Sequence, residues 1–274
     1  MMMDQKNSYK MFLIIAVILS IVGVGWLYVK YLSEINESLL TIKGARILAF
    51  IILIRVGVLS IMSFYVFHQW FKQEKQFLSD LPFLFGLVFL TLIFGKFLDL
   101  LFNLTFFTLN RETTLFLLKI RFFILIMTLF PFLYLSIRMI LYYLSLKERF
   151  KRLGNQNYQN KLTLFFLALI VSIESIAIIL APNFTVIGIL LPCFVIPSLL
   201  TIIWLFYFSY KNKALPSVNS KVLTIGFSAL LFSQFFRPIA QNIFGETMTY
   251  AIIVEGIDFF VFLIIFIGFY LEAY

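Results

Sequence analysis

The chain has 274 residues, of which 62% are hydrophobic and 19% aromatic, and its mean hydropathy is +1.01. Soluble domains are about 45–50% apolar, so this composition excludes a soluble globular protein and indicates an integral membrane protein. In a soluble chain the formal net charge of +9 would suggest nucleic-acid binding. In a membrane protein the same excess follows from the basic loops of the positive-inside rule. We therefore expect a lipid bilayer as partner and no nucleic acid.

Eight segments carry the roughly 20 mostly apolar residues that a bilayer-spanning helix requires. We expect an all-α, polytopic helical bundle of about eight transmembrane helices. The first helix reads as a retained signal anchor, so residues 1–46 are expected to form this helix and an outer loop, and residues 47–274 a seven-helix core. The predicted spans are 11–30, 47–70, 82–106, 114–146, 162–181, 184–210, 221–241 and 249–271.

Basic residues in the loops predict the orientation of the bundle. With the N-terminus inside, the inner side contains the strongly basic loop 147–161. The basic residues of the outer side are then only Lys30, Lys43, Arg46 and Arg111. The positive-inside rule then places both termini in the cytoplasm.

The scarcity of cysteine and histidine limits the chemistry of the chain. A single cysteine, Cys193, excludes an internal disulfide, and with a single histidine, His68, it excludes Cys- or His-rich metal sites. The sequence has no His-Glu-x-x-His motif and no glycine-rich phosphate loop. We expect no enzymatic activity, no metal and no cofactor. We also expect Cys193 to be buried in a kinked helix, and Trp26, Trp70 and Trp204 to lie at the membrane interface, near the ends of spans.

Ionisable side chains inside the predicted spans are the most informative feature. A charge at the bilayer centre costs at least about 2.5–3.5 kcal/mol, so such groups usually face a protein interior or a watery cavity. Arg138 maps to the inner half of the membrane and the others to the outer half, which suggests an outward-facing polar site. The candidate ligand-binding residues are Arg55, Lys96, Asp99, Lys119, Arg121, Glu174, Arg237, Glu255 and Asp258.

Spacing adds detail to this set. Lys96 and Asp99 are three residues apart on one helix face and can neutralise each other. Glu255 and Asp258 have the same spacing but repel, so they need a cation or basic partners. The candidates for that role are Arg55, Lys119, Arg121 and Arg237. Structural ion pairs, a ligand pocket and an ion or proton path are all compatible with this pattern.

Residues 47–270 resemble the seven-transmembrane sensor module at the N-terminus of many prokaryotic histidine kinases. The stretch from Leu118 to Met139 carries this likeness, with its basic start, mid-helix Pro131 and later Arg138, together with FGKFLDLLFNL at 94–104. The resemblance implies a sensor in a prokaryotic cytoplasmic membrane that binds a ligand from outside and passes helix movement inward.

The sequence continues only to Tyr274 and contains no coiled coil or kinase domain. We therefore expect signalling through a separate protein or a homo-oligomer. The expected function is a receptor-like protein binding a small polar or charged ligand. A small transporter or ion or proton channel, and a structural subunit of a membrane complex, are the alternatives.

Overall fold

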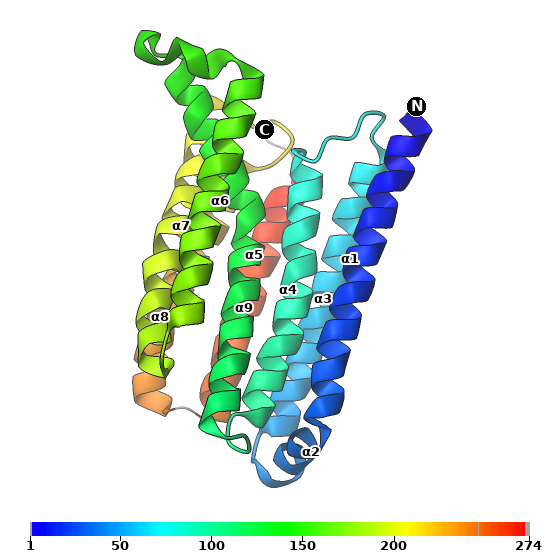
Figure 1. Cartoon of the computed structure of the whole chain (residues 1–274), viewed down its shortest axis with the longest axis vertical. Coiled ribbons are helices and arrows are strands. Elements are labelled where there is room, and N and C mark those ends of the chain that lie inside the picture. Colours follow the sequence, from blue (N-terminus) through cyan, green and yellow to red (C-terminus); the bar gives the residue numbers. More distant parts are fainter. Residues whose placement is uncertain (1, 246, 272–274) are drawn as a thin grey trace. The chain divides into compact units, whose positions relative to one another are not determined.

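The computed structural model describes residues 2–245 and 247–271, and every regular element within them is a helix (Figure 1). In this part of the chain, 8 helices are long and apolar enough to cross a membrane, which confirms the predicted polytopic bundle. The elements are α1 (Met2–Lys30), α2 (Leu32–Thr41), α3 (Ala45–Lys72), α4 (Leu81–Thr105), α5 (Arg111–Ser145), η1 (Glu148–Gly154), α6 (Gln156–Leu180), α7 (Phe184–Asn212), α8 (Ser220–Phe244) and α9 (Met248–Tyr270).

The chain divides into two compact units, Met1–Thr128 and Leu129–Tyr274, with α5 passing from the first to the second. The division into residues 1–46 and 47–274, the orientation in the membrane and the cytoplasmic termini stay predictions. The terminal residues themselves, 1 and 272–274, lie outside the described residues.

In the first unit, α3 and α4 form the principal antiparallel pair. Phe85 and Phe89 of α4 and Leu48 and Ile52 of α3 have no exposed surface. Gly86 lets the ring of Phe67 approach, because a Cβ built on Gly86 would lie 2.8 Å from that ring. Large side chains fill the space on either side of this close contact, as in any well-packed helix pair.

The short helix α2 corrects the sequence prediction, which treated residues 31–46 as a loop. Ile35 and Ser38 are buried on one of its faces. At its C-terminal side, Nε of Arg46 donates to the carbonyl oxygen of Leu39 at 3.0 Å. A ten-residue helix is too short to carry the length signal of a membrane span, so a search for apolar runs misses it.

In the second unit, aromatic rings from three helices meet in the core. The rings of Phe206 on α7 and Phe227 on α8 are stacked, with centroids 5.3 Å apart and planes at 6°. Phe132 of α5 meets Phe227 edge-on at 5.0 Å and 83°. Such contacts stabilise helix association beyond the area they bury.

Helices α8 and α9 approach each other closely through two glycines. A Cβ on Gly226 would lie 2.8 Å from Ile265, and one on Gly268 would lie 2.9 Å from the backbone nitrogen of Leu223. The backbone nitrogen of Asn219 also donates to the carbonyl oxygen of Gly268 at 2.8 Å. Small residues are the usual means of close backbone approach in membranes.

We expect Gly268→Ala to destabilise the protein by about 1–3 kcal/mol, the usual cost of overpacking, since the obstructing atom is backbone and cannot rotate away. Gly256→Ala on the same helix is the matched control, because nothing lies within 4 Å of its Cβ position. Unfolding in mixed detergent micelles would measure both variants. Equal stability of the two would contradict the close contact.

The prediction that Cys193 is buried is wrong. Cys193 is exposed, because it lies on a face of α7 that no described residue covers. Trp70 has no exposed surface. Its Nε1 donates to the carbonyl oxygen of Phe77 and to Oδ2 of Asp80, both at 3.2 Å. The turn between α3 and α4 therefore covers this tryptophan, which lies near the end of α3 as predicted; its place at the membrane interface stays a prediction.

Candidate functional site

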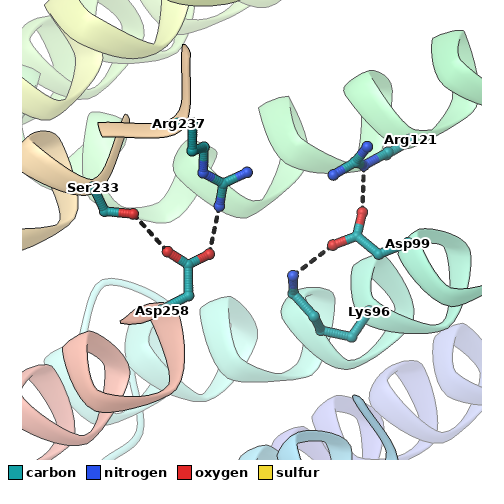
Figure 2. A network of polar contacts seen from close by, with 6 residues as sticks. All are labelled: Lys96, Asp99, Arg121, Ser233, Arg237 and Asp258. Atoms are coloured by element: carbon teal, nitrogen blue, oxygen red, sulfur yellow. Dashed lines mark hydrogen bonds and ion pairs between the residues drawn. The ribbon is translucent and has the colours of Figure 1, made fainter. Parts of the chain in front are cut away.

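The first charged cluster lies in the first unit, where Asp99 of α4 receives two cations. Nζ of Lys96 lies 2.5 Å from Oδ2 of Asp99, which confirms that this i,i+3 pair neutralises locally. Nε of Arg121 on α5 forms an ion pair with the other carboxylate oxygen, Oδ1. Figure 2 shows both contacts. One carboxylate therefore joins α4 to α5 and separates two positive charges.

Helix bounds set the depth of this cluster. Asp99 lies six residues before the end of α4, and Arg121 ten residues after the start of α5. At 1.5 Å per residue these positions are about 9 Å and 15 Å from the helix ends. The cluster is thus inside the span but nearer to one membrane face. The phenol oxygen of Tyr28 donates to the carbonyl oxygen of Phe97 at 2.7 Å, which attaches α1 beside it.

The three side chains differ in exposure. The side chains of Lys96 and Asp99 are 7% and 10% exposed, whereas that of Arg121 is 29% exposed. The Arg121 guanidinium also lies over the ring of Phe102, with its central carbon 5.4 Å from the ring centroid. Among the described residues, nothing else bonds to Arg121, so its terminal nitrogens Nη1 and Nη2 keep their hydrogen-bonding capacity for another group.

The second charged cluster lies in the second unit, between α8 and α9. Nη2 of Arg237 lies 2.5 Å from Oδ2 of Asp258, and the Ser233 hydroxyl donates to Oδ1 of Asp258 at 2.7 Å (Figure 2). The Asp258 side chain is 3% exposed and that of Arg237 is 23% exposed. Both oxygens of this buried carboxylate are therefore bonded, and one of the predicted basic partners of the acidic pair on α9 is identified as Arg237.

The remaining candidate residues differ in their surroundings. Arg55 and Glu255 are buried on α3 and α9, and Lys119 is half-buried on α5. Glu174 is buried on α6, and it makes no hydrogen bond or ion pair within the described part of the chain. Half-buried Arg138 belongs to the second unit. Five of the charged residues therefore take part in the ion pairs described above; ligand binding by any of the candidates stays a prediction.

Sequence reasoning missed the uncharged members of both clusters. Ser233 lies one helical turn before Arg237, so their shared face was a usable signal. Tyr28 and Phe102 gave no such signal, because tyrosine and phenylalanine occur throughout the apolar segments. Their contact with the cluster depends on which helices are neighbours, which the sequence alone does not give.

Comparisons with protein-family models, with curated proteins and with solved structures found no match. The fold and the two charged clusters are therefore the basis for any functional conclusion.

Proposed function

We propose that this protein is a membrane receptor or sensor that binds a small anion at Arg121. The observation that carries the proposal is the geometry of that side chain. Nε is held by Asp99, one face lies on Phe102, and both terminal nitrogens remain available inside a membrane-spanning helix. A guanidinium in lipid is costly, so an arginine placed this way is expected to face a watery opening.

Guanidinium chemistry defines the ligand class. The planar fork of arginine matches the two oxygens of a carboxylate or phosphate, and the resulting charge-assisted bonds are about twice as strong as neutral ones. Asp99 fixes the orientation of Arg121 before any ligand arrives, which lowers the ordering cost of binding. A small carboxylate or phosphate compound is therefore the expected ligand.

The distribution of charge along α3, α4 and α5 favours binding over conduction. Lys96, Asp99 and Arg121 lie toward the C-terminal end of α4 and the N-terminal end of α5. The stretches 56–67 of α3, 81–95 of α4 and 122–137 of α5 contain no charged residue. A transporter or channel needs a polar route to the other face of the membrane, and the charged residues of these helices provide none.

The ion pair between Asp99 and Arg121 supplies a route from binding to signal. An anion at Nη1 and Nη2 competes with Asp99 for the positive charge of Arg121, and it therefore changes the balance of attraction between α4 and α5. A ligand that prefers one arrangement of these helices shifts the population toward it. A separate protein or a second copy of the chain would then read out this change.

The test is a screen of thermal unfolding of the detergent-purified protein against small carboxylates, phosphates, amines and neutral compounds. Stabilisation follows RT ln(1 + [L]/Kd), about 2.7 kcal/mol at 100-fold excess over Kd. We expect an anion to stabilise the protein and Arg121→Gln to abolish the effect. Arg111→Gln is the matched control, since Arg111 is an exposed arginine at the start of the same helix.

Two results would contradict the proposal. One is stabilisation by amines instead of anions. The other is a folded Arg121→Gln variant that keeps the full response to the anion. A folded wild-type protein that no anion stabilises would instead favour a structural role for both ion-paired clusters.

A further inference from the structure

A basic hollow lies in the second unit, on the turn between two membrane-spanning helices. The turn consists of η1, which begins three residues after the end of α5 and ends two residues before the start of α6. The turn forms an open cavity with a volume of about 380 Å³. Since α5 and α6 are both long and apolar enough to cross a membrane, the turn that joins them is expected at a membrane face.

The lining of this cavity carries an excess of positive charge. Arg149, Lys151 and Arg152 contribute three cations, and Glu148 contributes one carboxylate. Across the described residues, none of these four side chains takes part in an ion pair. The charge is therefore available to an external anion, and the Arg149 guanidinium lies over the Phe150 ring, with its central carbon 6.0 Å from the ring centroid.

Apolar surface adjoins the basic lining. Phe150 and Tyr158 line the cavity and are 40% and 49% exposed. Leu146 and Tyr142, on the segment that leads into the turn, are 67% and 57% exposed. A soluble acidic protein would need only the charges. A phospholipid needs both features, because its phosphate binds cations while its acyl chains cover apolar side chains next to them.

We propose that the η1 turn is a binding site for the headgroup of an anionic phospholipid. The lipid phosphate contacts Arg149, Lys151 and Arg152, and the glycerol and upper acyl chains lie against Phe150 and Leu146. Each basic residue near an anionic membrane surface contributes favourably to such binding. This site is independent of Arg121, because it depends on different residues, in the turn that follows the C-terminal end of α5, whereas Arg121 lies near the N-terminal end of that helix.

Native mass spectrometry of the full chain in detergent is the test, with phosphatidylglycerol and phosphatidylcholine as probes. We expect the wild type to retain phosphatidylglycerol at least tenfold better than phosphatidylcholine. The triple variant R149Q/K151Q/R152Q is expected to lose this preference. The matched control, K75Q/K211Q/K213Q, removes the same number of charges from other exposed loop or helix-end positions and is expected to keep it.

Three outcomes would overturn the proposal. The first is equal retention of the two lipids by the wild type. The second is loss of the preference in the control variant to the same extent as in the triple variant. The third is displacement of retained phosphatidylglycerol by inorganic phosphate or by an acidic peptide, since the site would then serve a soluble anion. Helical circular dichroism and size-exclusion profiles establish that each variant is folded.

Discussion

Asp99→Asn is expected to lower the free energy of unfolding by about 3–5 kcal/mol, the usual cost of removing one member of a buried ion pair. Asp99 lies between Lys96 and Arg121 and bonds to both. Without its negative charge, the buried Lys96 loses its partner and its ammonium faces the Arg121 guanidinium without a carboxylate between them. Unfolding in mixed detergent micelles, followed by circular dichroism, measures the loss.

Two further variants make this result specific. Glu37→Gln removes a carboxylate from an exposed position on α2 and is expected to change stability by less than about 0.5 kcal/mol. The triple change Lys96→Met, Asp99→Leu and Arg121→Met removes all charges of the cluster and is expected to recover most of the lost stability. A triple variant less stable than Asp99→Asn would show that the pairing does not explain the cost.

Asp258→Asn, in the second unit, is also expected to lower the free energy of unfolding by about 3–5 kcal/mol. Asp258 is the more buried of the two carboxylates, and both of its oxygens are bonded, one to Arg237 and one to Ser233. The same unfolding assay applies.

The contribution of charge is separated from that of the neutral hydrogen bond by Ser233→Ala. Side-chain hydrogen bonds in membranes average about 0.6 kcal/mol and reach about 1.7 kcal/mol, so Ser233→Ala is expected to cost far less than Asp258→Asn. Equal costs for the two variants would mean that packing around this site, and not the ion pair with Arg237, dominates its stability.

The membrane helices could be predicted from sequence because their signal is local. A run of about 20 apolar residues indicates a membrane-spanning helix and little else. The predicted spans match the observed helices to within a few residues for most of their length. The largest difference is at α1, which begins at Met2 and not at 11, and the next is at α6, which begins at Gln156 and not at 162. Its polar first turn, with Asn157 and Gln159, lacks the hydropathy by which the span was recognised. The short helix α2 was missed for a similar reason.

The pairing inside the charged clusters could be predicted only within one helix. The i,i+3 spacing gave the contact between Lys96 and Asp99 directly. The contacts of Arg121 with Asp99 and of Arg237 with Asp258 join different helices. Depth along each helix can be counted from the sequence. Rotation about the helix axis and the identity of the neighbour follow from packing, so the sequence left four basic residues as equal candidates for the acidic pair on α9.

Burial of individual residues was the least predictable property. Trp70 is covered because the turn after α3 folds back over it, and its indole N–H donates to the Asp80 carboxylate. No periodic pattern in the sequence predicts such a turn. Cys193 is exposed although it lies between apolar neighbours. In a membrane protein the lipid-facing and the buried surfaces are both apolar, so hydrophobicity does not distinguish them.

The central claim is that a watery opening reaches Arg121 from the outer face, and thiol labelling tests it most directly. Cys193→Ser provides a cysteine-free background, since the chain has one cysteine. Arg121→Cys and, as control, Phe123→Cys are then treated with a charged, membrane-impermeant methanethiosulfonate on one membrane face at a time. Phe123 lies on the same helix and is 44% exposed, so in the bilayer it is expected to contact lipid.

A thiol in lipid stays protonated and unreactive, whereas one in water forms the reactive thiolate. The account predicts rapid labelling at position 121 from the outer face and none at position 123. If position 121 is as unreactive as position 123, or is labelled only from the cytoplasmic face, the outward-facing site at Arg121 is contradicted.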